Sequence, residues 1–100
     1  MMSRIYTIDE IRGIAGEIAK RHGVDRMFLF GSYARGDAKA GSDLDFRIDN
    51  GRVCGLFALG GLYADLEDAF GTPIDLLTTN SLNEDFLREI AAEEVLIYGN

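Results

Sequence analysis

Apolar and polar residues follow two different periods along this chain, and the first period predicts a helix. After Thr7, apolar residues recur every three or four positions, which is the spacing of one helix face. Thr7 and Glu10 have the spacing of a capping box, in which each side chain binds a free backbone amide at the start of a helix. The pattern therefore predicts a helix that begins after Thr7 and ends at Gly23, a residue suited to the left-handed stop.

Three short segments predict strands. Residues 27–30 (MFLF) form a continuous apolar run of strand length and predict a buried strand. Residues 43–49 (DLDFRID) alternate strictly between charged and apolar side chains, so they predict a half-buried strand with an acidic face. Residues 72–78 (TPIDLLT) predict a third strand, with its proline at the entry where a missing amide does least harm.

Two further helices are predicted between and after these strands. Apolar residues recur at helical spacing over residues 56–70. Gly60 and Gly61 either split this segment or let another backbone approach closely, and we expect one helix. Ser81 and Glu84 repeat the capping-box spacing and predict that the last helix opens at Ser81. The apolar segment VLIY that follows is expected to pack on the core.

Length and composition favour one compact domain over residues 1–100, since the chain is 47% apolar and contains a single proline. No apolar stretch approaches the roughly 20 residues of a spanning helix, and the first residues lack the apolar core of a signal peptide. We therefore expect a cytoplasmic protein with no membrane partner. The single Cys54 is expected to be small apolar filler, and His22, with no second His or Cys near it, to cap a helix or lie on the surface.

The net charge of the chain limits the classes of partner that it is expected to bind. Ten basic and 17 acidic residues give a formal net charge of −7, which a phosphate backbone repels, so no direct nucleic-acid binding is expected. The same charge favours a basic protein, a cationic small molecule or divalent metal ions. A local basic patch could still bind one nucleotide.

Two aspartates of the second predicted strand are candidate metal ligands. Asp43 and Asp45 are two residues apart, so their carboxylates leave the same face with Cα atoms about 6.5 Å apart. A divalent cation relieves the repulsion between them, and Mg²⁺ accepts such oxygen ligands while it keeps waters and binds substrate phosphates. For these two residues alone, a solvated strand face is the alternative interpretation.

The neighbouring segments add candidate groups. Gly31 and Ser32 directly follow the first predicted strand, where a glycine lets a phosphate approach and the serine and following amides can donate hydrogen bonds. Asp75 lies between two apolar residues of the third strand; if it shares the face of the other aspartates, the three carboxylates can hold two metal ions and Asp75 can accept a hydroxyl proton. For Gly31 and Ser32 the alternative interpretation is an ordinary turn, and for Asp75 it is a polar residue without function.

The joint pattern resembles a known family. The segment GSYARGDAKAGSDLDF (residues 31–46) is similar to the signature of the minimal nucleotidyltransferases (MNT), which belong to the DNA polymerase β type nucleotidyltransferase superfamily. The segments LEDAFGTPIDLLTTNSL and REIAAEEVLIYG are similar to the end of that domain, so the resemblance covers about residues 5–98. It implies an α/β (α+β) fold: a small mixed sheet of three or more strands backed by helices.

The resemblance also implies the chemistry of the site, with one or two Mg²⁺ ions and ATP as the nucleoside triphosphate substrate. Arg35, in the A-R-G segment, either braces the loop or contacts phosphate, and we expect bracing. The remaining roles are triphosphate contacts for Gly31 and Ser32, metal ligands for Asp43 and Asp45, and third carboxylate, metal ligand and base for Asp75.

In members of this family paired with a toxin, AMP is transferred to a tyrosine of a HEPN-domain ribonuclease toxin, which is silenced.

One departure from the family pattern is Arg47, which follows Phe46 where an aliphatic pair is usual. Arg47 either pairs with Asp45 or Asp49 and weakens metal binding, or contacts substrate phosphate. Two other functions remain open: a non-catalytic antitoxin that masks its toxin, and a small-molecule transferase of the aminoglycoside type, for which the chain lacks the usual additional helical domain.

Overall fold

A four-stranded mixed sheet forms the centre of the computed structural model, which describes residues 4–100. Its order is β3-β2-β1-β4; β1 is antiparallel to both β2 and β4, and β2 is parallel to β3. No helix in this part of the chain combines the length and the hydrophobicity needed to cross a membrane. Along the chain the elements are α1 (Ile8–His22), β1 (Arg26–Phe30), α2 (Gly31–Arg35), β2 (Leu44–Asp49), α3 (Gly55–Phe70), β3 (Ile74–Thr78), the 3-10 helix η1 (Thr79–Ser81), α4 (Glu84–Ala91) and β4 (Val95–Tyr98).

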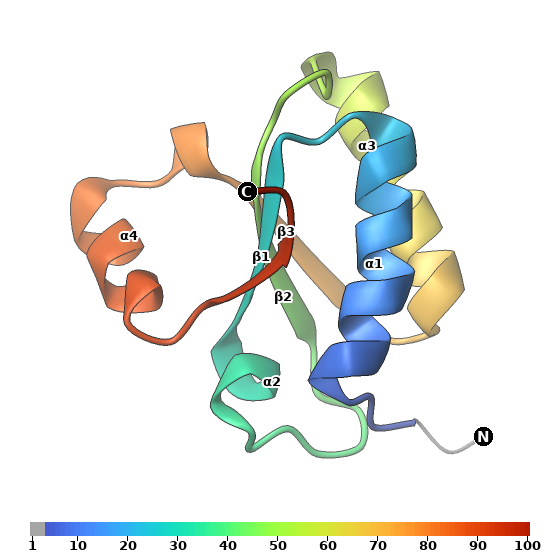
Figure 1. Ribbon diagram of the computed structural model, residues 1–100, viewed down its shortest axis with the longest axis vertical. Coiled ribbons are helices and arrows are strands. Elements are labelled where there is room, and N and C mark those ends of the chain that lie inside the picture. The colour runs from blue at the N-terminus through green and yellow to red at the C-terminus, as the bar shows by residue number, and fades with distance from the viewer. Residues whose placement is uncertain (1–3) are drawn as a thin grey trace.

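The helices lie on both sides of this sheet (Figure 1). The two long helices α1 and α3 cover one side, whereas α4 lies on the other and α2 at the end of β1. Helix α3 connects β2 to β3, as a crossover must when two neighbouring strands run parallel. This arrangement confirms the expected small mixed sheet backed by helices.

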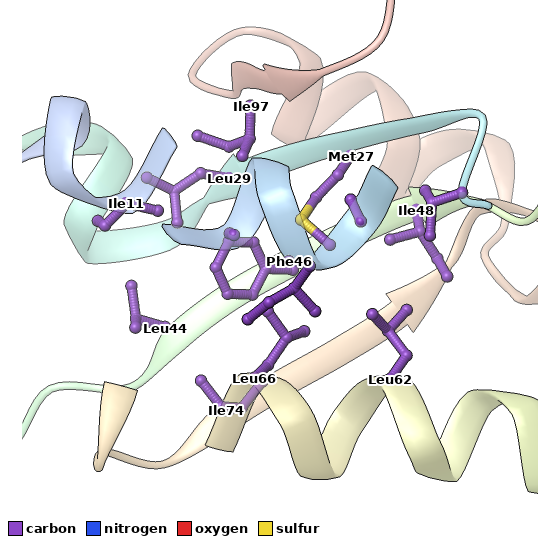
Figure 2. Close-up of a cluster of buried hydrophobic side chains, with 14 of the residues drawn as sticks. Ile11, Met27, Leu29, Leu44, Phe46, Ile48, Leu62, Leu66, Ile74 and Ile97 are labelled. Atoms are coloured by element: carbon purple, nitrogen blue, oxygen red, sulfur yellow. The ribbon is translucent and has the colours of Figure 1, made fainter. Parts of the chain in front are cut away.

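The core lies between the sheet and the two long helices (Figure 2). Strand β2 shows why: its apolar residues Leu44, Phe46 and Ile48 are fully buried on the face that α1 and α3 cover, so Asp45 and Arg47 point to the other side. The alternation predicted from the sequence is thus confirmed. Other fully buried side chains that Figure 2 labels are Ile11, Met27, Leu29, Leu62 and Leu66.

The first helix begins and ends where its sequence predicts. Thr7 Oγ1 accepts a hydrogen bond from the Glu10 amide at 3.1 Å, and Glu10 Oε1 accepts one from the Thr7 amide at 2.9 Å, which completes the capping box. Gly23 takes the left-handed conformation with φ of 77°. His22 Nε2 lies 2.7 Å from Asp65 Oδ2, so this side chain at the end of α1 links that helix to α3.

Two predictions are wrong, one about the start of α4 and one about the burial of Cys54. Ser81 does not cap α4: it lies in η1, where its hydroxyl donates to the Thr78 carbonyl, and the side chain of Asn83 accepts from the Phe86 amide at 2.8 Å instead. The chain leaves β3 through η1, and this turn delays the start of the helix. Cys54 is not core filler, because it precedes α3 and is exposed.

The segments with ambiguous patterns are resolved by packing. Helix α3 runs unbroken through Gly60 and Gly61, as expected. Its first predicted apolar residue, Leu56, is 86% exposed and so does not belong to the buried face of the helix. The VLIY segment is β4, which pairs with β1 and buries Ile97, so its packing on the core is confirmed.

Candidate active site

Gly31 connects β1 directly to α2, a helix of five residues where the sequence suggested only a turn. Its φ of +76° is a left-handed conformation that glycine adopts without strain. A Cβ at this position would lie 2.1 Å from Oδ2 of Asp45, the residue that pairs with Phe30 across β1 and β2. Gly31 is therefore required for two reasons, its backbone conformation and the close approach of a carboxylate.

An open cleft of about 700 Å³ lies around this contact. Five residues that the sequence singled out meet in its lining, and Asp75 is not among the lining residues. The full lining consists of Phe30, Gly31, Ser32, Arg35, Gly41, Ser42, Asp43, Asp45, Phe86, Glu89, Ile90 and Glu93.

Asp75 approaches the same carboxylates from the neighbouring strand. It is the register partner of Asp45 in the parallel pair of β2 and β3, so both side chains leave the same face of the sheet. Burial raises the pKa of Asp45 to about 6, and the negative charges of Asp75 and Asp43 add to this rise, whereas Arg35 opposes it. Asp75 and Asp43 therefore lie close enough to Asp45 for their negative charges to raise its pKa.

Within residues 4–100, however, no three or more His, Cys, Asp or Glu side chains are grouped closely enough to hold a metal ion. Asp75 is exposed on the edge strand β3, and Asp43 precedes β2, so the strict alternation of a strand does not orient its side chain. Mg²⁺ needs no complete protein cage, because it binds through one or two carboxylates together with waters and substrate phosphates. Asp43 and Asp45, both in the cleft, fit this requirement.

Glu93 is a residue of the cleft that the sequence did not indicate. Its Oε1 accepts a hydrogen bond from the Gly31 amide at 3.1 Å and lies 3.2 Å from Arg35 Nη1. Arg35 also lies 3.4 Å from Asp37, and the two carboxylates raise the pKa of the guanidinium, Glu93 most. In this structure Arg35 is thus paired with the carboxylates of Asp37 and Glu93. Sixty-two residues separate Gly31 from Glu93, and no local pattern reports such a contact.

Of the two aspartates expected as partners of Arg47, the structure pairs it with Asp49 and not with Asp45. Arg47 is 8% exposed, its Nη2 and Nε donate to the two carboxylate oxygens of Glu94 at 2.8 and 3.2 Å, and its Nη1 donates to Thr79 Oγ1 at 2.7 Å. Its guanidinium also stacks 4.1 Å from the centre of the Phe28 ring, and Asp49 lies 3.6 Å away. Arg47 is held by these groups and leaves the cleft aspartates without a cationic neighbour from β2.

A mixed sheet with a glycine packed against an Asp-x-Asp strand, and a further aspartate on the adjacent parallel strand, defines the class of polymerase β-like nucleotidyltransferases. The chain belongs to this family: the model of the polymerase beta nucleotidyltransferase domain matches residues 14–100. It is therefore an enzyme of the nucleotidyltransferase type.

Curated relatives cover most of the chain. It is 33% identical to the protein adenylyltransferase MntA of Thermococcus cleftensis over 93% of this chain and 98% of that protein. It is 40% identical to a candidate protein adenylyltransferase of Methanocaldococcus jannaschii over 76% of this chain and 82% of that protein. These similarities agree with the resemblance to minimal nucleotidyltransferases.

Solved structures share the fold. A candidate minimal nucleotidyltransferase is 26% identical and superposes with a TM-score of 0.76 over 90% of this chain and 95% of that one. A toxin-antitoxin structure with AMP-PNP gives a TM-score of 0.77 at 19% identity, over 89% of this chain and 73% of that one. A tri-AMPylated Shewanella oneidensis HEPN toxin in complex with its MNT antitoxin gives 0.72 at 16% identity, over 94% and 74%.

Proposed function

We propose that this protein transfers AMP from ATP to a tyrosine hydroxyl of a HEPN-domain toxin and thereby neutralises the toxin. The observation that carries the proposal is the carboxylate of Asp45 packed against Gly31 inside the cleft, beside Asp43. This arrangement puts metal-binding oxygens next to a backbone that a phosphate can approach. The relatives named as protein adenylyltransferases, and the solved complex of an AMPylated HEPN toxin with an MNT antitoxin, support the same activity.

The cleft offers separate polar and apolar walls to a nucleotide. Gly31, Ser32 and Arg35 supply hydrogen-bond donors for the triphosphate. Phe30 and Phe86 pack edge to face with ring centres 6.2 Å apart, an apolar wall suited to the ribose and base. A nucleoside triphosphate is an anion that also carries an apolar ring, so the two walls fit its two ends.

Asp43 and Asp45 would hold Mg²⁺, which stabilises the charge that develops on the leaving pyrophosphate. The acceptor oxygen forms a bond to the α-phosphorus of ATP, and the bond from that phosphorus to the bridging oxygen breaks, so pyrophosphate leaves with the electron pair. We assign the hydroxyl proton to Asp75, an exposed carboxylate in register with Asp45. Its exposure on the edge strand leaves it accessible to a side chain of a partner protein.

Labelled ATP tests the proposal directly. Incubated with Mg²⁺ and the HEPN partner, the wild-type protein should label the partner, and mass spectrometry should place the AMP on tyrosine. The Asp43→Ala, Asp45→Ala double variant should lose the label, whereas Asp68→Ala, an exposed carboxylate on α3, should retain it. Undiminished labelling by the double variant would contradict the mechanism. A stable complex with no label on the partner would instead support an antitoxin that masks the toxin without catalysis.

A further inference from the structure

Two consecutive glutamates between α4 and β4 each bind an arginine of another element. Glu94 accepts hydrogen bonds from Nε and Nη2 of Arg47 on β2. Both side chains are nearly buried, since 13% of the Glu94 side chain and 10% of the Arg47 side chain is exposed. Glu93 receives Arg35 from α2. The buried pair fixes the backbone at Glu94 to the sheet, and the side chain of Glu93, 28% exposed, is thereby held over the cleft.

The groups that Glu93 binds are the same groups assigned above to the triphosphate. Its Oε1 accepts from the Gly31 amide at 3.1 Å, and its two oxygens lie 3.2 and 3.3 Å from Arg35 Nη1. A backbone amide has one hydrogen to donate, so a phosphate oxygen and the Glu93 carboxylate compete for it. Both are anions, and both form charge-assisted hydrogen bonds with a guanidinium.

We propose that Glu93 is an internal competitor of the triphosphate, which occupies the phosphate-binding donors until the nucleotide displaces it. This inference rests on the proposed nucleotide site and identifies a residue that lowers the affinity of that site for the nucleotide. Since Glu94 remains fixed to Arg47, a displaced Glu93 side chain stays near the cleft and returns when the product leaves. Glu93 therefore weakens nucleotide binding and speeds release.

The charges of the cleft strengthen this competition. Arg35 is the one basic residue among the residues that line it, against the four acidic residues Asp43, Asp45, Glu89 and Glu93. While Glu93 pairs with Arg35, an incoming polyphosphate meets carboxylates and no free cation of the lining. Removal of Glu93 frees both a guanidinium and an amide, whereas removal of Glu89 takes away one negative charge and frees neither, because no hydrogen bond joins Glu89 to these donors within residues 4–100.

This difference gives a matched pair of variants, Glu93→Ala and Glu89→Ala, whose binding to magnesium tripolyphosphate is measured by calorimetry. A lost charge-assisted contact corresponds to a change of about tenfold, so Glu93→Ala should bind about tenfold more tightly than wild type and Glu89→Ala less than about threefold. Glu93→Gln, which retains an acceptor but no charge, should fall between them. Urea unfolding of each variant establishes that the fold is intact.

Equal gains in the two alanine variants would overturn the proposal in favour of simple charge repulsion. Unchanged or weaker binding by Glu93→Ala, including no binding by any variant, would also overturn it, because the freed donors would then not form an anion site. The AMP-transfer assay separates this result from the proposed function. A wild-type protein that transfers AMP while Glu93→Ala gains no affinity refutes only the competition, and tighter tripolyphosphate binding without any transfer refutes only the transferase activity.

Discussion

The α-carbon of Gly31 lies so close to the carboxylate of Asp45 that a methyl group on Gly31 would stand 2.1 Å from Asp45 Oδ2. The contact joins the end of β1 to the β2 residue that pairs with Phe30. It also places the half-buried carboxylate against the segment that we propose binds phosphate. The geometry of this pair thus couples the stability of the fold to the site.

Gly31→Ala should therefore destabilise the protein more than a Gly→Ala change at a position where the new side chain causes backbone strain but no clash. We expect a loss of about 3 kcal/mol in the free energy of unfolding, from the strained φ and the clash with Asp45 together. Gly36→Ala is the matched control, because its φ of +86° carries the same strain and its Cβ would meet nothing within 4 Å, so it should lose about 1 kcal/mol. Urea unfolding measures both, and equal losses would show that Asp45 does not restrict position 31.

The pKa of Asp45 predicts a pH dependence of stability. Because burial and the neighbouring carboxylates raise this pKa from 3.8 to about 6, the folded state binds more protons than the unfolded state between these values. The contribution of Asp45 to stability is therefore full below pH 4 and is lost as the pH rises through 6. At pH 7.5 the free energy of unfolding of Asp45→Asn should therefore exceed that of wild type by about 1 kcal/mol, a value reduced for solvent screening. Urea unfolding in buffer with EDTA measures this difference.

The same comparison at pH 4 supplies the control. There Asp45 is protonated in the folded protein, and the advantage of Asp45→Asn should shrink toward zero. Asp68→Asn, an exposed carboxylate on α3, should show no such change between the two pH values. An advantage of Asp45→Asn that is the same at pH 4 and pH 7.5 would exclude titration of Asp45 as its cause.

The buried pair of Arg47 and Glu94 should be costly to break from one side. Glu94→Leu removes the carboxylate nearest to the buried guanidinium and leaves only Asp49, 3.6 Å away, so we expect a loss of about 3 kcal/mol in the free energy of unfolding. The double variant Arg47→Met, Glu94→Leu should recover most of this loss, since it leaves no unpaired charge. Arg88→Ala, from an exposed pair with Asp85, should lose less than about 1 kcal/mol. A double variant as unstable as the single one would contradict this account.

The start of α4 gives a test of which residue caps it. Asn83→Ala removes the acceptor of the Phe86 amide and should cost about 1 kcal/mol of unfolding free energy. Ser81→Ala removes only an exposed hydroxyl bond to the Thr78 carbonyl in η1 and should cost less than about 0.5 kcal/mol. The opposite order in thermal or urea unfolding would restore Ser81 as the cap.

Local patterns were sufficient for much of the fold. The capping box of Thr7 and Glu10 depends on residues three apart, and the alternation along β2 depends on a period of two, so both are visible in the sequence. The same spacing misled at Ser81, because it does not reveal that the chain turns through η1 before the helix starts. Cys54 is exposed although its residue type favours burial, because burial depends on which elements pack against a position.

For the site, the sequence by itself determined which groups are available: a glycine and a serine after a buried strand, an Asp-x-Asp strand, and a later aspartate. Only the tertiary structure decided how these groups are paired. It placed Asp75 beside Asp45 but outside the cleft lining, directed Arg47 to Glu94, and brought Glu93 onto Gly31 and Arg35. The physical reason is the separation along the chain between the residues that interact. Helix caps and strand alternation arise between residues a few positions apart, whereas ion pairs and the pKa of a buried carboxylate depend on neighbours that the chain brings together across tens of residues.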